Sequence, residues 1–348
     1  MRFAAIWLAT LALGSCGIWG GLALWYQAPG AKIGKSLSVL LWAAFCIGLS
    51  IALHGDRTLL CLLTFAAVFG GLLFWWGRLA PSNDRDWLDD VAQMTAGEVE
   101  GNRVTLHNVR NFDWRTNADF TQRWETRRYD LERLCSLDMI MSYWTIPAIA
   151  HMLISFGFED GEHVVFSVEI RREKHEKYSE VGGFFKEFEL SVIAADERDV
   201  IRVRTNVRGE DAYLYRILVP PAAIRSLFLG YVAEANALLI KPRFYNTITV
   251  NCTTLVYHMM QRIVGYLPLN YRLLFSGYLP EYVYRVGGLD RRFSLQELRS
   301  RGRITERAIR ADRSESFSAD IRRGIAAPPD IGDDQAKEQH GRHVLGER

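Results

Sequence analysis

Acidic side chains are almost missing from the first 80 residues of this 348-residue chain. The stretch contains a single acid, Asp56, and five lysines and arginines, whereas the rest of the chain holds 39 acids and 37 basic residues. Charged side chains normally cover the surface of a soluble domain. Their scarcity here argues against an ordinary soluble N-terminal domain.

Three apolar runs fill this stretch instead, at residues 3–25, 37–53 and 59–76. Each has roughly the 20 residues that a helix needs to cross the hydrocarbon core of a bilayer. Aromatic residues typical of membrane interfaces lie near the run ends. These are Trp25, Tyr26, Trp42, Trp75 and Trp76. The pattern predicts three transmembrane helices within residues 1–80.

Loop charges do not set the orientation of these helices. Lys32 and Lys35 oppose Arg2 and Arg57 across the membrane, so the positive-inside rule is nearly balanced. A signal peptide or lipoprotein cleavage site before Cys16 is disfavoured, because the apolar run continues well beyond that cysteine.

Cysteines are few, and they form no CxxC or metal-type spacing. Three of the five, Cys16, Cys46 and Cys61, lie in the apolar runs. The sequence therefore predicts no disulfide framework, no metal and no cofactor. The remaining pair has two interpretations: a Cys135–Cys252 disulfide, or one reactive thiol and one structural cysteine.

A basic surface is also missing, since the total net charge is +2 and no nucleic-acid-binding motif occurs. We therefore expect no nucleic-acid partner. Two smaller charged groups have binding interpretations, although solvated charge, turn capping and salt bridges explain them as well. Arg110, Arg115, Arg127 and Arg128 are candidates for phosphate head groups, and Asp196-Glu197-Arg198-Asp199 for a cation.

The part after residue 80 has the mixed pattern of an α+β domain. Its clearest element is a hairpin, residues 149–158 and 163–172, joined by the turn Glu159-Asp160-Gly161-Glu162. Residues 120–134 are expected to be helical or irregular, and Pro220-Pro221 opens a helix. Further strands are expected at residues 102–112, 187–194, 200–207, 212–219 and 247–250.

The predicted organisation has three parts. Residues 1–80 form the three transmembrane helices, 81–312 form an α+β domain, and the polar residues 313–348 form a mobile tail. The sequence contains no internal repeat.

Cys252 stands at a position that favours chemistry. It follows a β-branched run and directly precedes the apolar-periodic residues 255–264, which predicts the first turn of a helix. The unpaired N–H groups and dipole of a helix start favour a thiolate, which is the nucleophilic form. A structural core cysteine is the competing interpretation.

A nucleophilic thiol needs a base. His258 points away from Cys252 along the same helix, and His175 lies in an exposed charged run. His151 begins a strand after apolar residues, which predicts a rigid and partly buried imidazole. If the hairpin turn is centred near Asp160, facing residues have numbers that sum to about 320, so Glu169 lies opposite His151. A register shifted by one residue would turn Glu169 to the other face.

Several segments resemble one bacterial family. They begin at His151, Ser167 and Asp196, and the most specific is Tyr245-Asn-Thr-Ile-Thr-Val-Asn-Cys-Thr-Thr254. Over roughly residues 81–325 the chain resembles the Lnb N-terminal periplasmic domain family. That family is similar to papain-like thiol enzymes in circularly permuted order, with histidine before cysteine, as in the NlpC and lecithin–retinol acyltransferase types.

This resemblance implies Cys252 as nucleophile and His151 as base, with Glu169 assigned as the orienting third residue. It also implies a site for the oxyanion or substrate around Asn251, Thr253 and Tyr245. The expected fold is a bundle of three transmembrane helices followed by a permuted papain-like domain, whose antiparallel sheet packs on the helix that carries the cysteine. The expected location is the bacterial inner membrane, with the soluble domain in the periplasm.

Three functions follow as hypotheses. The first is a thiol acyltransferase or hydrolase acting through an acyl-enzyme, in lipoprotein N-acylation or related envelope chemistry. The second is a cell-wall amidase or peptidase with the same residues, and the third is a non-catalytic envelope scaffold. The expected partners are membrane lipids, lipoproteins or peptidoglycan, and the sequence does not indicate an oligomeric state. An apolar groove beside Cys252 would favour acyl transfer, whereas an open polar cleft would favour peptidoglycan.

Overall fold

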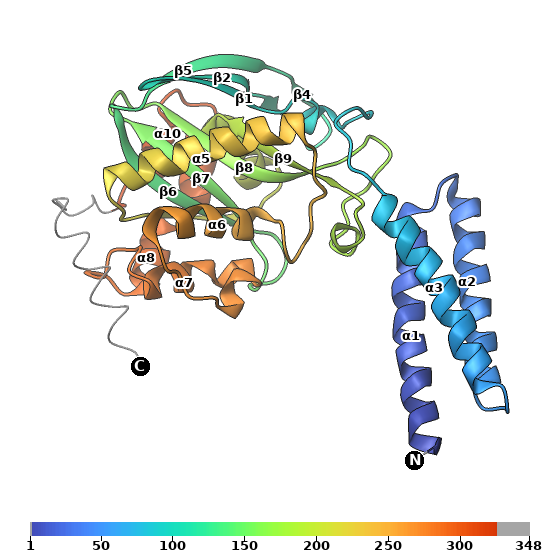
Figure 1. Ribbon diagram of the computed structural model, residues 1–348. Helices are drawn as coiled ribbons and strands as arrows, with labels where there is room; N and C mark the ends of the chain where they lie inside the picture. The colour runs from blue at the N-terminus through green and yellow to red at the C-terminus, as the bar shows by residue number, and fades with distance from the viewer. Residues whose placement is uncertain (1, 326–348) are drawn as a thin grey trace. The chain divides into compact units, whose positions relative to one another are not determined.

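The computed structural model describes residues 2–325 (Figure 1). The chain folds as two compact units. The first comprises Met1–Ser82, Lys177–Glu189 and Arg243–Thr247, and the second contains the other residues from Asn83 onward.

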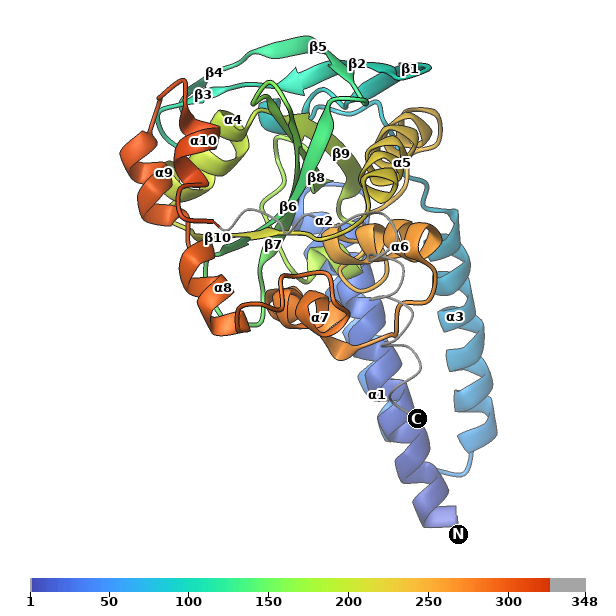
Figure 2. The same ribbon diagram turned by 90° about the vertical axis from the view of Figure 1, so that its left-hand side faces the viewer.

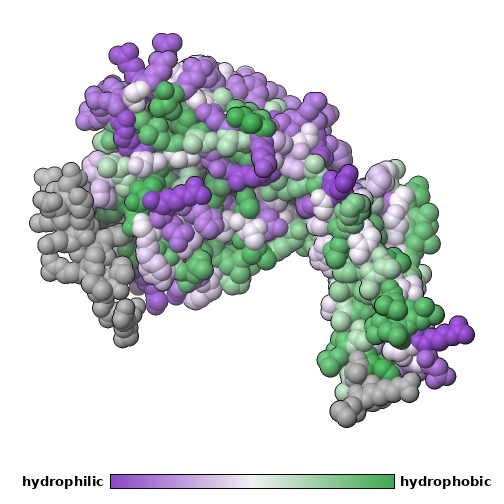
Figure 3. Space-filling model, viewed as in Figure 1, coloured by the Kyte–Doolittle hydropathy of each residue, from purple (hydrophilic) through white to green (hydrophobic). Residues whose placement is uncertain are grey.

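Helices α1 (Arg2–Gln27), α2 (Lys32–Ala52) and α3 (Thr58–Arg78) make up most of the first unit. Apolar side chains lie on their outside as well as between them: Leu8 and Ile18 are 68% and 70% exposed. Figure 3 shows this hydrophobic surface. Helices that are apolar all round are typical of a lipid environment. All three are candidate membrane spans by length and composition, and they coincide with the predicted runs.

Two segments from later in the sequence complete the first unit. The Phe185 ring stacks on Tyr26 with ring centroids 5.7 Å apart. Gln27 donates from Nε2 to the Lys186 carbonyl at 2.7 Å, and Lys186 donates from Nζ to the Trp76 carbonyl at 2.8 Å. These contacts attach the loop Lys177–Glu189 to the ends of the helices. No periodicity in the sequence indicated this attachment.

The second unit is built on a mixed eight-stranded sheet with the order β1-β2-β9-β8-β7-β6-β10, in which β5 also pairs with β2. The pairs β1–β2, β2–β5, β6–β7, β6–β10 and β7–β8 are antiparallel, whereas β2 pairs with β9 in parallel. A separate two-stranded sheet pairs β3 (Asp113–Trp114) with β4 (Phe120–Thr121). The large sheet contains β1 (Ala96–Glu100), β2 (Arg103–Arg110), β5 (Trp124–Asp130), β6 (Leu134–Tyr143), β7 (His151–Phe158), β8 (His163–Arg171), β9 (Glu189–Ala195) and β10 (Asp211–Arg216). The α+β class predicted from the sequence is confirmed.

One face of this sheet is covered by α5 (Pro221–Ile240) and α6 (Cys252–Val264) (Figure 2). Phe166 of β8 stacks on Tyr231 of α5 with ring centroids 4.9 Å apart. Helix α5 is long and apolar enough to cross a membrane. One side of it, however, is buried in the domain from Ala223 to Leu238. It therefore belongs to the core of the second unit.

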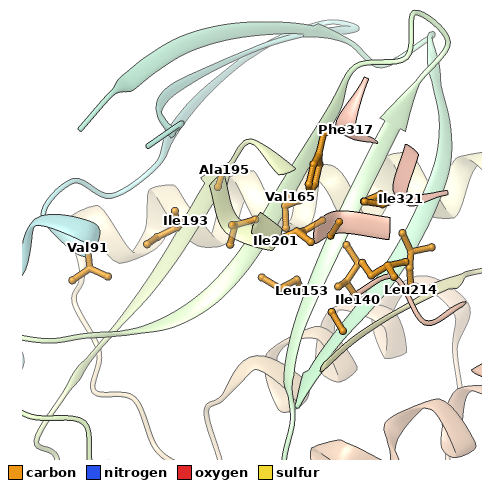
Figure 4. Packing of buried hydrophobic residues seen from close by; sticks show 14 residues of the cluster. Val91, Ile140, Leu153, Val165, Ile193, Ala195, Ile201, Leu214, Phe317 and Ile321 are labelled. Atoms are coloured by element: carbon orange, nitrogen blue, oxygen red, sulfur yellow. The ribbon is translucent and has the colours of Figure 1, made fainter. Parts of the chain in front are cut away.

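The opposite face is covered by α4 (Glu197–Arg202), α9 (Thr305–Ala311) and α10 (Phe317–Ile321). Alternation along the strands sends one set of side chains to each face. The set on this face meets the helices in the cluster of Figure 4. It includes Ile140, Leu153, Val165, Ile193, Ile201, Leu214, Phe317 and Ile321.

The predicted hairpin is confirmed as β7 and β8, and its register is confirmed as well. Leu153 faces Ser167 and Gly157 faces His163, and both pairs have numbers that sum to 320. This sum places His151 and Glu169 on the same face at the ends of the two strands. The turn residues had predicted this register.

Three local predictions were wrong. Residues 200–207 form α4 and a following π-helical turn, Val203–Val207, instead of a strand. Glu197, Val200, Ile201 and Arg204 are buried at helical spacing. Because two of these four residues are charged, the sequence does not show this spacing as an apolar pattern.

Residues 124–130, expected to be helical or irregular, form β5. This strand pairs with β2 although its apolar and polar residues alternate only weakly. Residues 247–249 form a turn instead of the strand expected at 247–250.

The ordered structure continues past the predicted boundary at residue 312. Phe317 and Ile321 of α10 are fully buried in the core cluster. The predicted tail beyond residue 325 lies outside the described residues.

Candidate active site

Helix α6 begins at Cys252, and Asn251 is its cap. Asn251 Oδ1 accepts hydrogen bonds from the Thr253 and Thr254 amides, both at 2.9 Å. Thr254 Oγ1 accepts in return from the Asn251 amide at 2.9 Å, which completes a capping box. Cys252 is therefore held in the first turn, at the positive end of the helix dipole.

The hairpin positions the imidazole and the carboxylate. His151 Nε2 lies 3.2 Å from Glu169 Oε1 and 2.8 Å from Ser167 Oγ. Ser167 donates its hydroxyl proton to Glu169 Oε1 at 2.6 Å, so the serine oxygen is left to accept from Nε2–H. This arrangement assigns the proton to Nε2 and leaves Nδ1 for another partner.

The thiol is the candidate for that partner. Cys252 and His151 lie close enough that each shifts the pKa of the other, and the Met152 backbone amide also lowers the pKa of the thiol. Because Nε2 faces Ser167 and Glu169, we infer that the thiol meets Nδ1. Residues far apart in sequence thus form one line: sulfur, imidazole and carboxylate.

The electrostatics of this line favour a charged pair. Burial would raise the pKa of the Cys252 thiol, but the hydrogen bond and charge of His151 outweigh it and lower that pKa below its ordinary value. Burial would likewise lower the pKa of His151, yet the Glu169 carboxylate raises it to about 9. The pKa of Glu169 lies well below its ordinary value despite burial, because of His151 and Arg204. Both shifts favour the thiolate–imidazolium pair over the neutral pair.

Arg204 is a residue that the sequence analysis missed. It donates from Nη2 to Glu169 Oε1 at 2.9 Å and from Nη1 to the Val200 carbonyl at 2.8 Å. It is only 5% exposed and lies on the π-helical turn after α4. The site is therefore a row of alternating charges from Cys252 to Arg204. Recognising the helical burial period of 197–204 would have pointed this arginine inward.

The cap limits which groups can stabilise an oxyanion. The Thr253 and Thr254 amides are already used by Asn251, whereas the Cys252 amide is not engaged by the cap. The Thr253 hydroxyl is buried and lowers the pKa of the thiol, and it has no hydrogen-bond partner among residues 2–325. Tyr245 belongs to the first unit, where its amide donates to the Phe188 carbonyl at 2.9 Å.

Residues 120–277 match the Lnb N-terminal periplasmic domain family. The family resemblance predicted from the sequence is therefore confirmed over these residues. The match is shorter than the predicted resemblance over 81–325, but it includes His151, Glu169, Arg204 and Cys252. No curated protein and no solved structure matches the chain.

The family assignment and the apolar helices together indicate a membrane-associated protein with a periplasmic domain. The matched residues contain both cysteines that lie outside the apolar helices, and the disulfide interpretation for these two is wrong. Cys135 and Cys252 are both free. Cys135 lies at the register shift near the start of β6, while His151 lies opposite Ser142 near the other end of that strand. The extended strand separates the two positions by roughly 20 Å.

Most members of the two charged groups that the sequence offered as binding sites are ion-paired. Arg110 donates to Asp199 at 2.9 and 3.1 Å, and Arg127 donates to Asp196 at 2.7 Å. Asp196 also caps α4. Salt bridges and capping therefore account for these residues, and within residues 2–325 no group of three or more metal-ligating side chains comes together.

Proposed function

We propose that this protein is an inner-membrane thiol acyltransferase or hydrolase whose periplasmic domain forms an acyl-enzyme on Cys252. The observation that carries the proposal is the line Cys252–His151–Glu169 at the start of a capped helix. In the proposed topology α1–α3 cross the membrane. The domain is proposed to be of the permuted papain-like type, since its histidine strand precedes the cysteine helix in the chain.

The proposed reaction has two steps. The Cys252 thiolate attacks the carbonyl carbon of an ester or amide, and a C–S bond forms as the C–O or C–N bond breaks. The His151 imidazolium donates its proton to the leaving group, and the Cys252 amide is placed to donate to the oxyanion. An amine or water then attacks the thioester, gives its proton to His151 and releases the thiolate.

The surface near His151 favours an acyl substrate over a cell-wall peptide. Trp144 and Ile146 are exposed just before β7, and Leu274 and Phe275 are exposed on a later loop. Backbone and side-chain bonds hold that loop beside the start of β7. They are Gly277 N–H to the Ala148 carbonyl at 3.0 Å and Ser276 Oγ to the Ala150 carbonyl at 2.7 Å. Exposed apolar groups gathered in this way are typical of lipid or partner contact.

The test is peptide mass spectrometry of the full chain purified from membranes. We expect a hydroxylamine-sensitive acyl adduct on Cys252 that is missing in Cys252→Ala. A peptidoglycan-derived adduct would instead favour the amidase. Absence of any adduct, together with unchanged lipoprotein acylation and cell-wall composition in His151→Ala cells, would leave only the non-catalytic scaffold.

A further inference from the structure

Six arginines line a groove of about 670 Å³ on the second unit. They come from α8 (Leu295–Gly302) with the residue after it, from α9, and from the segment after α10. The arginines are Arg299, Arg301, Arg303, Arg307, Arg310 and Arg323. Glu306 is the one acid among the residues that line the groove.

A close backbone contact brings these side chains together. Gly302 is buried against β10, and a Cβ at this position would lie 2.5 Å from the Leu214 carbonyl oxygen. The Ile304 amide then donates to the Ala212 carbonyl at 2.9 Å. The end of α8 is thereby fixed on the sheet edge, and α9 starts immediately beside it.

Carboxylates neutralise only part of this charge. Asp211 accepts from Arg303 at 2.9 Å, and Asp320 lies 2.6 Å from Arg323. Among residues 2–325, no carboxylate lies within salt-bridge distance of the other four arginines. Burial and the charge of Arg310 lower the pKa of Arg307, as expected where positive charge is in excess.

Two of the four guanidinium groups are held in place without being neutralised. Arg307 donates from Nη2 to the Arg301 and Arg303 carbonyls at 2.6 and 3.0 Å. Arg299 stacks over the Tyr213 ring, 4.9 Å from its centroid. Basic residues in the last turn of α8 also interact favourably with the helix dipole. That interaction does not explain why the guanidinium groups are held in fixed positions. Fixed guanidinium forks reduce the entropy lost when an anion binds.

We propose that this groove binds the phosphate groups of a ligand larger than inorganic phosphate. Arginine forks match the geometry of phosphate oxygens, and the volume lies in the range of roughly 300–1,000 Å³ typical of small-molecule sites. An anionic lipid head group and a soluble diphosphate share this chemistry. The proposal does not depend on the thiol chemistry of Cys252.

The experiment is calorimetric titration of the detergent-solubilised full chain with three probes: pyrophosphate, glycerophosphoglycerol and the zwitterionic glycerophosphocholine. We expect one or both anionic probes to bind and the zwitterionic probe to bind at least about tenfold more weakly. Tighter binding of glycerophosphoglycerol identifies a lipid head group as the source, and tighter binding of pyrophosphate identifies a soluble ligand.

The variant Arg307→Gln/Arg310→Gln should weaken anion binding at least about tenfold. The control Arg103→Gln/Arg128→Gln removes the same charge from exposed positions on β2 and β5 and should change affinity less than about twofold. If the first variant does not fold, Arg310→Gln/Arg323→Gln replaces it, because both side chains are exposed. No anion binding, or equal weakening in the control, would overturn the proposal.

Discussion

Arg204 and His151 share one carboxylate oxygen, Glu169 Oε1, at 2.9 and 3.2 Å. The arginine comes from the turn after α4 and the histidine from the start of β7. Glu169 thus orients the imidazole from one side while Arg204 fixes Glu169 from the other. The arginine acts on the thiol only through two intervening side chains.

Replacing Arg204 with methionine should therefore loosen the site without touching Cys252. We expect a loss of roughly 3 kcal/mol in the free energy of unfolding, the low end for a broken buried pair because Glu169 keeps His151 and Ser167. Acyl-adduct formation should also slow by about tenfold. Urea unfolding and adduct kinetics measure these effects. Arg208→Met is the control, since Arg208 donates to Asn117, and equal effects in both variants would contradict the assigned role.

The reactivity of Cys252 should report the thiolate directly. Because the pKa of Cys252 is lowered and that of His151 is raised to about 9, alkylation by iodoacetamide should be fast at pH 7. In His151→Gln we expect it to fall by about tenfold or more at pH 7 and to recover as the pH rises towards 9. Peptide-level mass spectrometry follows the reaction, with the free thiol of Cys135 as internal reference. Identical pH profiles for the two cysteines would refute the ion pair.

Stability should depend on pH through the same pair. The pKa of His151 is raised from 6.5 to about 9, so its contribution is complete below 6.5 and is lost as pH rises through 9. The pKa of Glu169 is lowered from 4.5, so its contribution is present above 4.5 and is lost as pH falls further.

Comparison with Glu169→Gln isolates this effect. The stability difference between the two proteins should be largest between pH 4.5 and 6.5 and should decline towards pH 9. Unfolding in a Cys252→Ala background measures it without the thiolate. A difference that grows between pH 7 and 9 would have the wrong sign for this mechanism.

Asn251 should prove to be a cap. Asn251→Ala removes both bonds to the Thr253 and Thr254 amides and should cost about 1–2 kcal/mol of stability. Asn251→Asp keeps the accepting oxygen and should restore most of it. Thermal unfolding distinguishes the variants, and an unstable Asp variant with a stable Ala variant would rule out capping as the main role.

The apolar surface beside His151 should discriminate between substrates. Phe275→Glu introduces charge there, so labelling of Cys252 by a long-chain acyl thioester should fall by about tenfold while labelling by an acetyl thioester changes little. Ile240→Glu is the control, because Ile240 is also an exposed apolar side chain and lies at the end of α5. If labelling by the long-chain and the acetyl thioester fell equally, Phe275 would be needed for folding and not for substrate binding.

Much of this arrangement could be predicted locally. The turn at Asp160 specifies which residues of β7 and β8 face each other, since the period of a strand is two and the turn sets the register. Cys252 at a helix start follows from the apolar period behind it. By contrast, residues 200–207 look β-branched in part, and only burial against the sheet shows that Arg204 faces inward.

The amino-acid sequence was sufficient for the three apolar helices, the α+β class and the hairpin that aligns His151 with Glu169, because each depends on local periodicity or on a short turn. The meeting of His151 with Cys252, the attachment of Arg204 and the packing of loop 177–189 on α1 and α3 needed the tertiary structure. Contacts of that kind join segments distant in sequence. Their energies come from burial and charge pairing that no single segment contains.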